Sequence, residues 1–494
     1  MKPSILISAS EAVPFAKEGG LADVVGALPK ELLRQGHDVR LVMPLYGSID
    51  RERFGLWRRE GVLVVPMGVL GDQYCAVWEG RIPGSDVQVY FLEHDLYFGR
   101  KGGLYSHDNV GYADNGLRFV FLSRATLELP KMIRFRPDVI HLHDWHTAVA
   151  ALFLNALYRD DQWVGSAASL LTIHNMQYQG EFHKSLMDVL GVGWEYFTWL
   201  GLERHDQVNL LKGGLYHATL LSTVSEGYAR EIQTPEFGWG LEGVVRERAA
   251  DLVGILNGVD YDEWNPETDP LIPATYTVED RSGKRVCKMK LQERFSLPVD
   301  DRKPVFAMVS RLVKQKGIDI LAEALPHILG LDLQLVLLGS GEPWSHFHFG
   351  EQAALNPSKF ACSIGYDTHL AHLIEAGADF FLMPSLFEPC GMSQMYSMRY
   401  GTLPIVRATG GLVDSVENFD EQRLTGTGFV FRDHTASALY DTIGWALHTW
   451  YNRPEAMDAL IRSAMNARFH WSESAERYGE LYRRAIVRKR GNVA

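Results

Sequence analysis

The sequence has few cysteines, no long apolar run and no excess of basic residues. Its four cysteines never form a Cys-x-x-Cys pair, which disfavours a disulfide scaffold or a zinc site and favours a reducing compartment. No apolar run approaches the roughly 18–20 residues that span a bilayer, and the run at residues 5–7 is too short for a signal peptide. The net charge of −12 argues against a nucleic-acid partner, since phosphate backbones are bound by basic surfaces. We therefore expect a cytoplasmic protein with no nucleic-acid and no membrane partner.

The length of 494 residues and the hydrophobic content of 46% indicate a globular protein with more than one core. Single cores rarely exceed about 250–300 residues, so two domains are expected. Neither an internal repeat nor a low-complexity stretch is present.

Short apolar runs alternate with longer helical patterns, which is typical of parallel α/β structure. The expected strands cover residues 5–9, 138–142, 170–173, 220–224, 253–256, 305–309, 333–338, 380–383 and 404–406. They form two series, which predicts two doubly wound, Rossmann-like domains at residues 1–252 and 253–470. We expect a hinge at residues 257–264 and a surface connection at residues 269–282, where polar residues and two prolines occur.

Polar and glycine residues follow strand after strand. Ser10-Glu11 follows the first expected strand, His143-Asp144 the second and His174-Asn175 the third. In open α/β sheets ligands bind at the carboxyl ends of the strands. These positions are therefore the candidates for a site.

One segment places a carboxylate, a thiol and a glycine directly before an expected helix. It reads Phe387-Glu388-Pro389-Cys390-Gly391-Met392-Ser393-Gln394. A glycine amide at a helix start can approach an anion closely. A carboxylate three residues earlier would oppose positive charge, such as that which develops at a sugar centre. This combination favours a glycosyl-transfer site.

The segment Lys17-Glu18-Gly19-Gly20 precedes a helical pattern of apolar residues. Glycine amides at a helix start and a lysine nearby suit a phosphate or hydroxyl group. The alternative is a glycine-rich turn with an exposed lysine.

The segment from His141 to His146 contains three histidines and Asp144. On a strand His141 and His143 share a face while His146 lies past the strand end, so three-ligand metal geometry is disfavoured. We interpret the segment as a polar cluster in which Asp144 binds a sugar hydroxyl or opposes positive charge. His174 ends the next strand, and its alternative role is that of a core histidine.

Arg311 follows the strand at residues 305–309, and Lys316 stands just before a helical pattern. Two cations around one loop suit a diphosphate leaving group, where each donor contributes roughly 3–4 kcal/mol to the transition state. The alternative is a basic, solvated loop. Small residues follow three more strands at Gly339, Gly365-Tyr366 and Thr409-Gly410, and none of these turns has the G-x-G-x-x-G spacing of a dinucleotide site.

With these motifs in this order, the chain resembles the bacterial glycogen synthases, the starch-synthase-type family of retaining glucosyltransferases. The resemblance runs nearly from end to end. It covers residues 17–25, 143–145, 172–178, 212–216, 257–260, 310–317, 387–391 and 409–412. The family implies a GT-B architecture, in which two Rossmann-like domains face an interdomain cleft and residues 471–494 cross back to the first domain.

The resemblance also implies roles for single residues. Lys17, Gly19 and Gly20 would meet the donor, Asp144 and His174 would contact the transferred glucose, and Asn257 would lie at the hinge. Arg311 and Lys316 would hold the diphosphate, and Glu388 would face the sugar. The further binding residues would be Gly339, Tyr366 (stacking on the nucleobase), Cys390, Gly391, Met392, Ser393, Thr409 and Gly410.

Two residues depart from common patterns. Glu18 replaces a threonine of the family's first loop, and we expect its carboxylate to point away from the diphosphate, which it would repel. Tyr396 occupies the position where related retaining transferases often carry a second glutamate, so ribose recognition by a carboxylate there is excluded.

The implied reaction transfers glucose from ADP-glucose to the non-reducing end of glycogen or another α-1,4-glucan, with retention of configuration. It implies no cofactor and no metal, because two cationic side chains can stabilise the leaving group. Two alternatives stay open. One is another GT-B enzyme that uses UDP-glucose or a small acceptor, and the other is a catalytically inactive glucan-binding protein.

Overall fold

The computed structural model describes residues 2–107 and 110–491. The chain divides into two compact units. Unit 1 contains the chain up to Val224, Ala229–Gly258 and the chain from Trp471 onward, and unit 2 contains Ser225–Tyr228 and Val259–His470. The passage from unit 1 to unit 2 therefore lies after Gly258, within the segment expected to be a hinge and not after residue 252. Residues 1, 108–109 and 492–494 of the expected domains lie outside the described residues.

Unit 1 is built on a mixed sheet in the order β15-β14-β10-β9-β1-β2-β6-β5-β3, with β4 paired to β5. The parallel strands are β1 (Ser4–Ser8), β2 (Asp38–Pro44), β6 (Gln88–Glu93), β9 (Val139–His143), β10 (Ala168–Ile173), β14 (Leu220–Thr223) and β15 (Leu252–Gly254). The antiparallel edge consists of β5 (Asp72–Arg81), β3 (Trp57–Arg58) and β4 (Leu63–Pro66). Every residue of β9 and β10 is buried, as expected for strands with helices on both faces.

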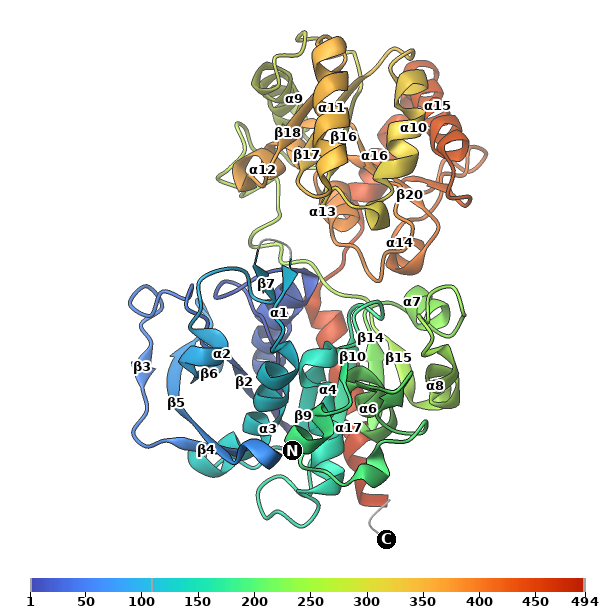
Figure 1. The fold of residues 1–494 in the computed structure, drawn as a ribbon. Helices are drawn as coiled ribbons and strands as arrows, with labels where there is room; N and C mark the ends of the chain where they lie inside the picture. The colour runs from blue at the N-terminus through green and yellow to red at the C-terminus, as the bar shows by residue number, and fades with distance from the viewer. Residues whose placement is uncertain (1, 108–109, 492–494) are drawn as a thin grey trace. The chain divides into compact units, whose positions relative to one another are not determined.

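Helices cover both faces of this sheet. Its strand order reverses between β1 and β9, and right-handed crossovers on either side of such a reversal place their helices on opposite faces. α1 (Gly20–Arg34) packs against α17 (Trp471–Gly491), whereas α4 (Asp144–Ala156) packs against α3 (Asn115–Ile133) and α6 (Leu210–His217). In Figure 1, α17 appears in red among the blue and green elements of unit 1, against β9 and β10.

Unit 2 is built on an all-parallel sheet in the order β18-β17-β16-β19-β20-β21. Its strands are β16 (Val305–Val309), β17 (Gln334–Gly339), β18 (Phe360–Ile364), β19 (Phe380–Met383), β20 (Leu403–Arg407) and β21 (Phe429–Phe431). Its main helices are α9 (Ser282–Arg294), α10 (Ile318–Ile328), α11 (Pro343–Leu355), α12 (Thr368–Gly377), α13 (Ser393–Arg399), α14 (Gly410–Ser415), α15 (Ala436–Asn452) and α16 (Pro454–Asn466). The expected α/β class with two doubly wound units is confirmed.

The segment at residues 269–282 was expected at the surface; most of its residues are exposed or half-buried, but the prediction was wrong for three of them. Ile272 and Tyr276 belong to a buried core cluster, and Asp269 is buried beside them. The Tyr276 hydroxyl donates to the carbonyl oxygens of Ala376 (3.2 Å) and Tyr400 (2.9 Å). Asp269 and Tyr276 are thus internal hydrogen-bonding groups, which composition alone does not distinguish from solvated ones.

Within the described parts of the chain, no helix is long and apolar enough to cross a membrane.

Candidate active site

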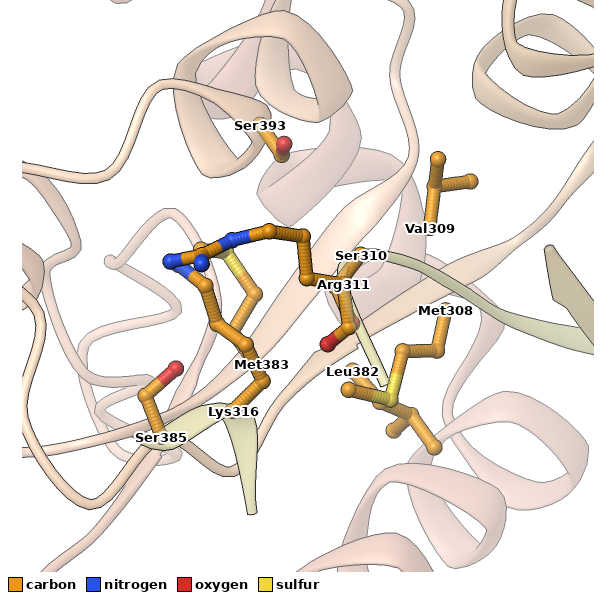
Figure 2. Close-up of a pocket in the computed structure, with 9 residues that line it drawn as sticks. All are labelled: Met308, Val309, Ser310, Arg311, Lys316, Leu382, Met383, Ser385 and Ser393. Atoms are coloured by element: carbon orange, nitrogen blue, oxygen red, sulfur yellow. The ribbon is translucent and has the colours of Figure 1, made fainter. Parts of the chain in front are cut away.

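The sheet of unit 2 contains a pocket where its strand order reverses. The chain proceeds from β16 toward β18 on one side and from β19 toward β21 on the other. Such a reversal leaves a crevice at the carboxyl ends of the two central strands. A pocket of about 200 Å³ lies there, with apolar side chains of β16 and β19 in its wall. Its polar lining consists of Ser310, Arg311, Lys316, Ser385 and Ser393 (Figure 2).

Two cations line this pocket. Arg311 is exposed, and its Nη2 donates to Oε1 of Gln315 at 3.3 Å. Lys316 is half-buried, and its Nζ lies 2.6 Å from Oε2 of Glu388. Figure 2 shows both side chains extending toward the same side of the pocket. A forked guanidinium and a point-like ammonium over one cavity suit a group with several phosphate oxygens.

Glu388 is buried beside Lys316, although 72 positions separate the two residues. Its Oε2 also accepts from the Ser385 hydroxyl at 3.1 Å, and its backbone carbonyl accepts from the amide of Gly411 at 3.0 Å. The carboxylate is therefore held in one orientation by a cation and a hydroxyl. Its negative charge can stabilise positive charge that develops at the edge of the pocket.

Gly339 contributes close backbone packing. A Cβ atom there would lie 2.0 Å from the carbonyl oxygen of Ser310, next to Arg311. Only glycine lets β17 end this close to the loop that carries Arg311. Gly339 was expected to bind substrate, and the contact seen here is with the backbone beneath the cation.

The loop from Glu388 to α13 is held by one side chain. Nε2 of Gln394 donates to the carbonyls of Cys390 (3.2 Å) and Gly391 (3.1 Å) and to Oγ of Ser415 (2.9 Å). Met392 immediately precedes α13, and Ser393 begins that helix and lines the pocket.

The remaining expected residues of unit 2 lie at other strand ends. Thr409 lies between β20 and α14, and Gly410 begins α14 with a φ of 47°. Tyr366 follows β18 and is 78% exposed. Its open ring is available to a flat ligand such as a nucleobase.

The sheet of unit 1 carries a buried carboxylate where its order reverses. Asp144 follows β9 and has a φ of 53°, a conformation that L-residues seldom adopt. Its Oδ1 accepts from the backbone amides of His174 (2.7 Å) and Asn175 (3.4 Å). Burial raises the pKa of Asp144 to about 7, although these two amides oppose the rise.

A second buried carboxylate, Glu11, lies on the neighbouring strand end. Its Oε2 accepts from the amides of Glu18 and Gly19, the latter at 3.1 Å, and its Oε1 accepts from the Tyr105 hydroxyl at 3.2 Å. Burial raises the pKa of Glu11 to about 7, and its charge also raises the pKa of Asp144. Sequence reasoning placed Glu11 at a strand end but gave it no role. The signal that could have identified Glu11 is its position just after the first strand.

The glycine loop of unit 1 is thus organised by Glu11. Lys17 pairs with Asp23 of α1 at 2.7 Å, and its side chain is half-exposed. Gly19 immediately precedes α1 and Gly20 begins it. The Glu18 side chain is exposed, and its orientation relative to a bound diphosphate stays a prediction.

The histidines near Asp144 form buried pairs. Nδ1 of His143 lies 2.8 Å from Nε2 of His174, while His141 contacts the Tyr482 hydroxyl (2.9 Å) and the Thr172 hydroxyl (2.6 Å). Burial lowers the pKa of His174 to about 3, so this ring is neutral at physiological pH. Among the described residues, no group of three or more His, Cys, Asp or Glu side chains is placed to hold a metal ion.

Asn257 follows β15 at the end of unit 1 and is buried. Within the described residues its Oδ1 atom has no hydrogen-bond partner. A buried amide oxygen without a partner is costly, which makes Asn257 a candidate ligand-binding group.

Both halves of the chain match known families. A family model described as starch synthase catalytic domain matches residues 4–247, and one described as glycosyl transferases group 1 matches residues 289–465. Glycogen synthase 1 of Geobacter sulfurreducens is 68% identical over 488 residues, which cover 99% of this chain and 97% of that protein. The glycogen synthase of Anaeromyxobacter sp. is 46% identical over 481 residues, covering 97% and 98%.

A solved structure is similar over the same length. It is the catalytic domain of starch synthase IV from Arabidopsis thaliana bound to ADP and acarbose, with a TM-score of 0.91 and 33% sequence identity. The match covers 99% of this chain and 100% of that one.

Two doubly wound units and a pocket lined by two cations define a glycosyltransferase of the GT-B class. The chain belongs to the glycogen synthase family and is a glucosyltransferase. The resemblance noted from the sequence is confirmed.

Proposed function

We propose that the protein transfers glucose, with retention, from ADP-glucose to the non-reducing end of glycogen or a related α-1,4-glucan. The observation that carries the proposal is the pocket at the ends of β16 and β19, lined by Arg311 and Lys316. Two cations at one crevice fit the diphosphate of a nucleotide sugar. The similarity to glycogen synthases and to a starch synthase solved with bound ADP supports this donor and this acceptor.

In unit 2, Arg311 and Lys316 bind the diphosphate and stabilise the charge that grows on it as the sugar leaves. Glu388 opposes the positive charge at the sugar ring. Tyr366 stacks on the nucleobase. Ser393 and the backbone around Cys390, Gly391, Met392, Thr409 and Gly410 hold phosphate oxygens or sugar hydroxyls. Gly339 lets the end of β17 pack closely against the loop that carries Arg311.

In unit 1, Asp144 and the neutral His174 contact the transferred glucose. Asp144 accepts hydrogen bonds from sugar hydroxyls, and His174 is available as a neutral hydrogen-bonding group. The loop of Lys17, Gly19 and Gly20 meets the donor, and Asn257 supplies its unpartnered oxygen to the ligand.

The reaction breaks the bond between glucose C1 and the diphosphate oxygen and forms a bond between C1 and the acceptor hydroxyl oxygen. The acceptor proton passes to the departing diphosphate on the same face, so configuration is retained without a covalent enzyme intermediate. Isolation of a glucosyl adduct on Glu388 or Asp144 would overturn this scheme.

The two cations supply the electrostatic stabilisation of the leaving group that a metal ion would otherwise give, so we propose a metal-independent reaction without a cofactor. All four cysteines are free thiols. Free thiols suit a reducing compartment, and we propose the cytoplasm as the site of action.

The test is transfer of labelled glucose to glycogen, from ADP-glucose and from UDP-glucose, without added metal. Glu388→Gln keeps an acceptor for Lys316 and Ser385 but loses the charge. Its kcat should fall about 10²–10³-fold, as for other preorganised electrostatic groups. Glu351→Gln, at an exposed position of α11, is the matched control and should retain full activity.

The outcomes separate the alternatives. Transfer from ADP-glucose that collapses only in Glu388→Gln supports the proposal. Preference for UDP-glucose would replace the donor and leave the mechanism. Absence of transfer from either donor, with glycogen still bound, would replace the enzyme by a glucan-binding protein.

A further inference from the structure

A buried histidine of unit 1, His143, contacts a proposed glucose-binding residue without having a role of its own in the scheme above. Nδ1 of His143, the last residue of β9, lies 2.8 Å from Nε2 of His174, which directly follows β10. The two residues are 31 positions apart and meet because β9 and β10 are neighbouring parallel strands. The contact therefore fixes how the His174 ring is presented to a sugar.

The His143 ring is held in one orientation. It is fully buried and packs against the ring of His141, with 4.2 Å between the ring centroids. The two nitrogens of His141 contact the hydroxyls of Tyr482 (2.9 Å) and Thr172 (2.6 Å). His143 therefore directs Nδ1 at His174 from a fixed position.

Both members of the pair are neutral. Burial lowers the pKa of His143 well below its usual value, and positive charge on His141 or His174 would lower it further. Burial also lowers the pKa of His174 to about 3. A neutral imidazole has one N–H donor and one acceptor nitrogen. The contact of 2.8 Å therefore contains a single proton, which either His143 or His174 donates.

The second nitrogen of His143 favours one of these two arrangements. Within the described residues, Nε2 of His143 is buried and has no hydrogen-bond partner. If His174 were the donor, the proton of His143 would lie on this Nε2, as a buried N–H group without an acceptor. If His143 is the donor, Nε2 is only an unfilled acceptor. Buried N–H groups without a partner are rarer than unfilled acceptors, so the second arrangement is favoured.

This arrangement places the proton of His174 on its other nitrogen, Nδ1. In the described part of the chain, Nδ1 of His174 makes no hydrogen bond and, unlike Nε2 of His143, is not fully buried. The carboxyl of Asp144 belongs to the same strand ends, since its Oδ1 accepts from the His174 amide at 2.7 Å. A donor on His174 and an acceptor on Asp144 suit sugar hydroxyls, which both donate and accept. With the reversed tautomer, both side chains would be acceptors.

We propose that His143 is a positioning residue, whose Nδ1–H donates to His174 and thereby keeps the His174 proton on Nδ1, where it is offered to a hydroxyl of the transferred glucose. His143 does not touch the sugar and acts only through His174. The last step of this inference rests on the proposed function. The position of the two protons does not, because it needs no substrate.

The first test locates the two protons in the full-length wild-type chain. Long-range proton–nitrogen correlation spectra of protein with isotopically labelled histidine distinguish a ring proton on Nδ1 from one on Nε2. The spectrum of His174→Gln identifies the His174 signals by their loss. His143 and His174 should both carry their proton on Nδ1. A His174 proton on Nε2 would overturn the inference, and this holds even if a variant of His143 fails to fold.

The second test compares two amides at position 143. His143→Asn places its amide nitrogen where Nδ1 lies and keeps a donor for His174, whereas His143→Gln places its amide near the former Nε2. With ADP-glucose and glycogen, kcat should fall about tenfold in His143→Gln, as expected for one misdirected hydrogen bond, and stay within about threefold of wild type in His143→Asn. The His174 proton should remain on Nδ1 only in His143→Asn.

His205→Asn is the matched control, because His205 is exposed in unit 1 and its φ of 51° suits asparagine. It should change neither kcat nor the His174 signals. Equal losses of kcat in His143→Gln and His143→Asn, with the His174 proton on Nδ1 in both, would overturn the positioning role. The expected proton positions in a wild-type protein that transfers no glucose would uphold the proton assignment and refute the proposed function.

Discussion

Each unit has a sheet whose strand order reverses near its centre, but the charged side chains at the two reversal points have opposite sign. In unit 2 the crevice between β16 and β19 holds the cations Arg311 and Lys316 around an open pocket. In unit 1 the corresponding strand ends of β1 and β9 hold the buried carboxyls of Glu11 and Asp144. One fold thus serves two kinds of chemistry through a few residues at its strand ends.

The difference shows which parts are prepared before a ligand arrives. The unit 2 crevice keeps its cations near solvent or paired with Glu388, ready for exchange with phosphate oxygens. The unit 1 carboxyls are already bonded to backbone amides and have pKa values raised to about 7 by burial. Changes at the first place should therefore affect catalysis most, and changes at the second should affect stability as a function of pH.

The largest effect is expected at Lys316. Lys316→Ala removes one of the two cations assigned to the leaving group, so kcat should fall about 10³-fold. Lys314→Ala, which removes an exposed lysine from the same short helix, should leave kcat within about twofold of the wild type. Equal kcat values for the two variants in the ADP-glucose assay would remove Lys316 from the mechanism.

Two glycine-to-alanine variants should distinguish the effect of close backbone packing on stability from the effect of helix propensity. Gly339→Ala forces a Cβ atom to 2.0 Å from the Ser310 carbonyl, and should lower the unfolding free energy of unit 2 by about 2 kcal/mol or more. Gly350→Ala, on α11 with no atom within 4 Å of the added Cβ, should raise it by about 0.5–1 kcal/mol. Denaturant titration of both variants measures the contrast, and effects of the same sign would contradict it.

Glu11 should make stability depend on pH. Its pKa rises from 4.5 to about 7 on folding, so its stabilising contribution is complete below about pH 4.5 and is lost as the pH rises through about 7. Glu11→Gln retains an acceptor for the two amides and stays neutral. The stability of this variant relative to wild type should therefore increase by a few kcal/mol between about pH 5 and about pH 8.

Denaturant midpoints at the two pH values measure this difference. Glu60→Gln, at an exposed position of unit 1, should show the same difference from wild type at both. A Glu11→Gln profile as flat as that of the control would mean that the Glu11 carboxyl is not perturbed.

The smallest effect is expected at Tyr366. Tyr366→Ala removes an exposed ring, so folding should be unaffected, while the KM for ADP-glucose should rise about three- to tenfold through lost stacking. Tyr366→Phe keeps the ring and should match the wild type. An unchanged KM in Tyr366→Ala would assign nucleobase binding to another residue.

The local patterns of the sequence were sufficient to predict the fold class and the strand-end positions. The apolar runs at residues 305–309 and 380–383 became β16 and β19, and the residues after them line the pocket. Parallel strands are buried on both faces, so they leave a strong apolar signal. The expected strands nevertheless omitted the parallel strands β2, β6, β18 and β21. They also omitted the antiparallel edge at β3, β4 and β5, whose residues are partly exposed.

Long-range partners could not be predicted in this way. The pair of Lys316 and Glu388 joins two loops 72 positions apart, and Glu11 acts on amides that another turn supplies. Trp239 owes its position to Arg204 and Gln179, which no local spacing connects to it. Such contacts follow from the packing of the whole sheet and not from the periodicity of one segment.

Helix α17 gives unit 1 a discontinuous chain. Tyr478 and Tyr482 of this helix are fully buried, and Tyr482 bonds to His141 of β9. A ribosome makes this helix only after the whole of unit 2, so the nascent first unit holds an uncovered apolar face while the second is being synthesised. Premature termination before Trp471 would thus leave unit 1 incomplete. Such fragments should aggregate or be degraded, because their apolar face stays uncovered.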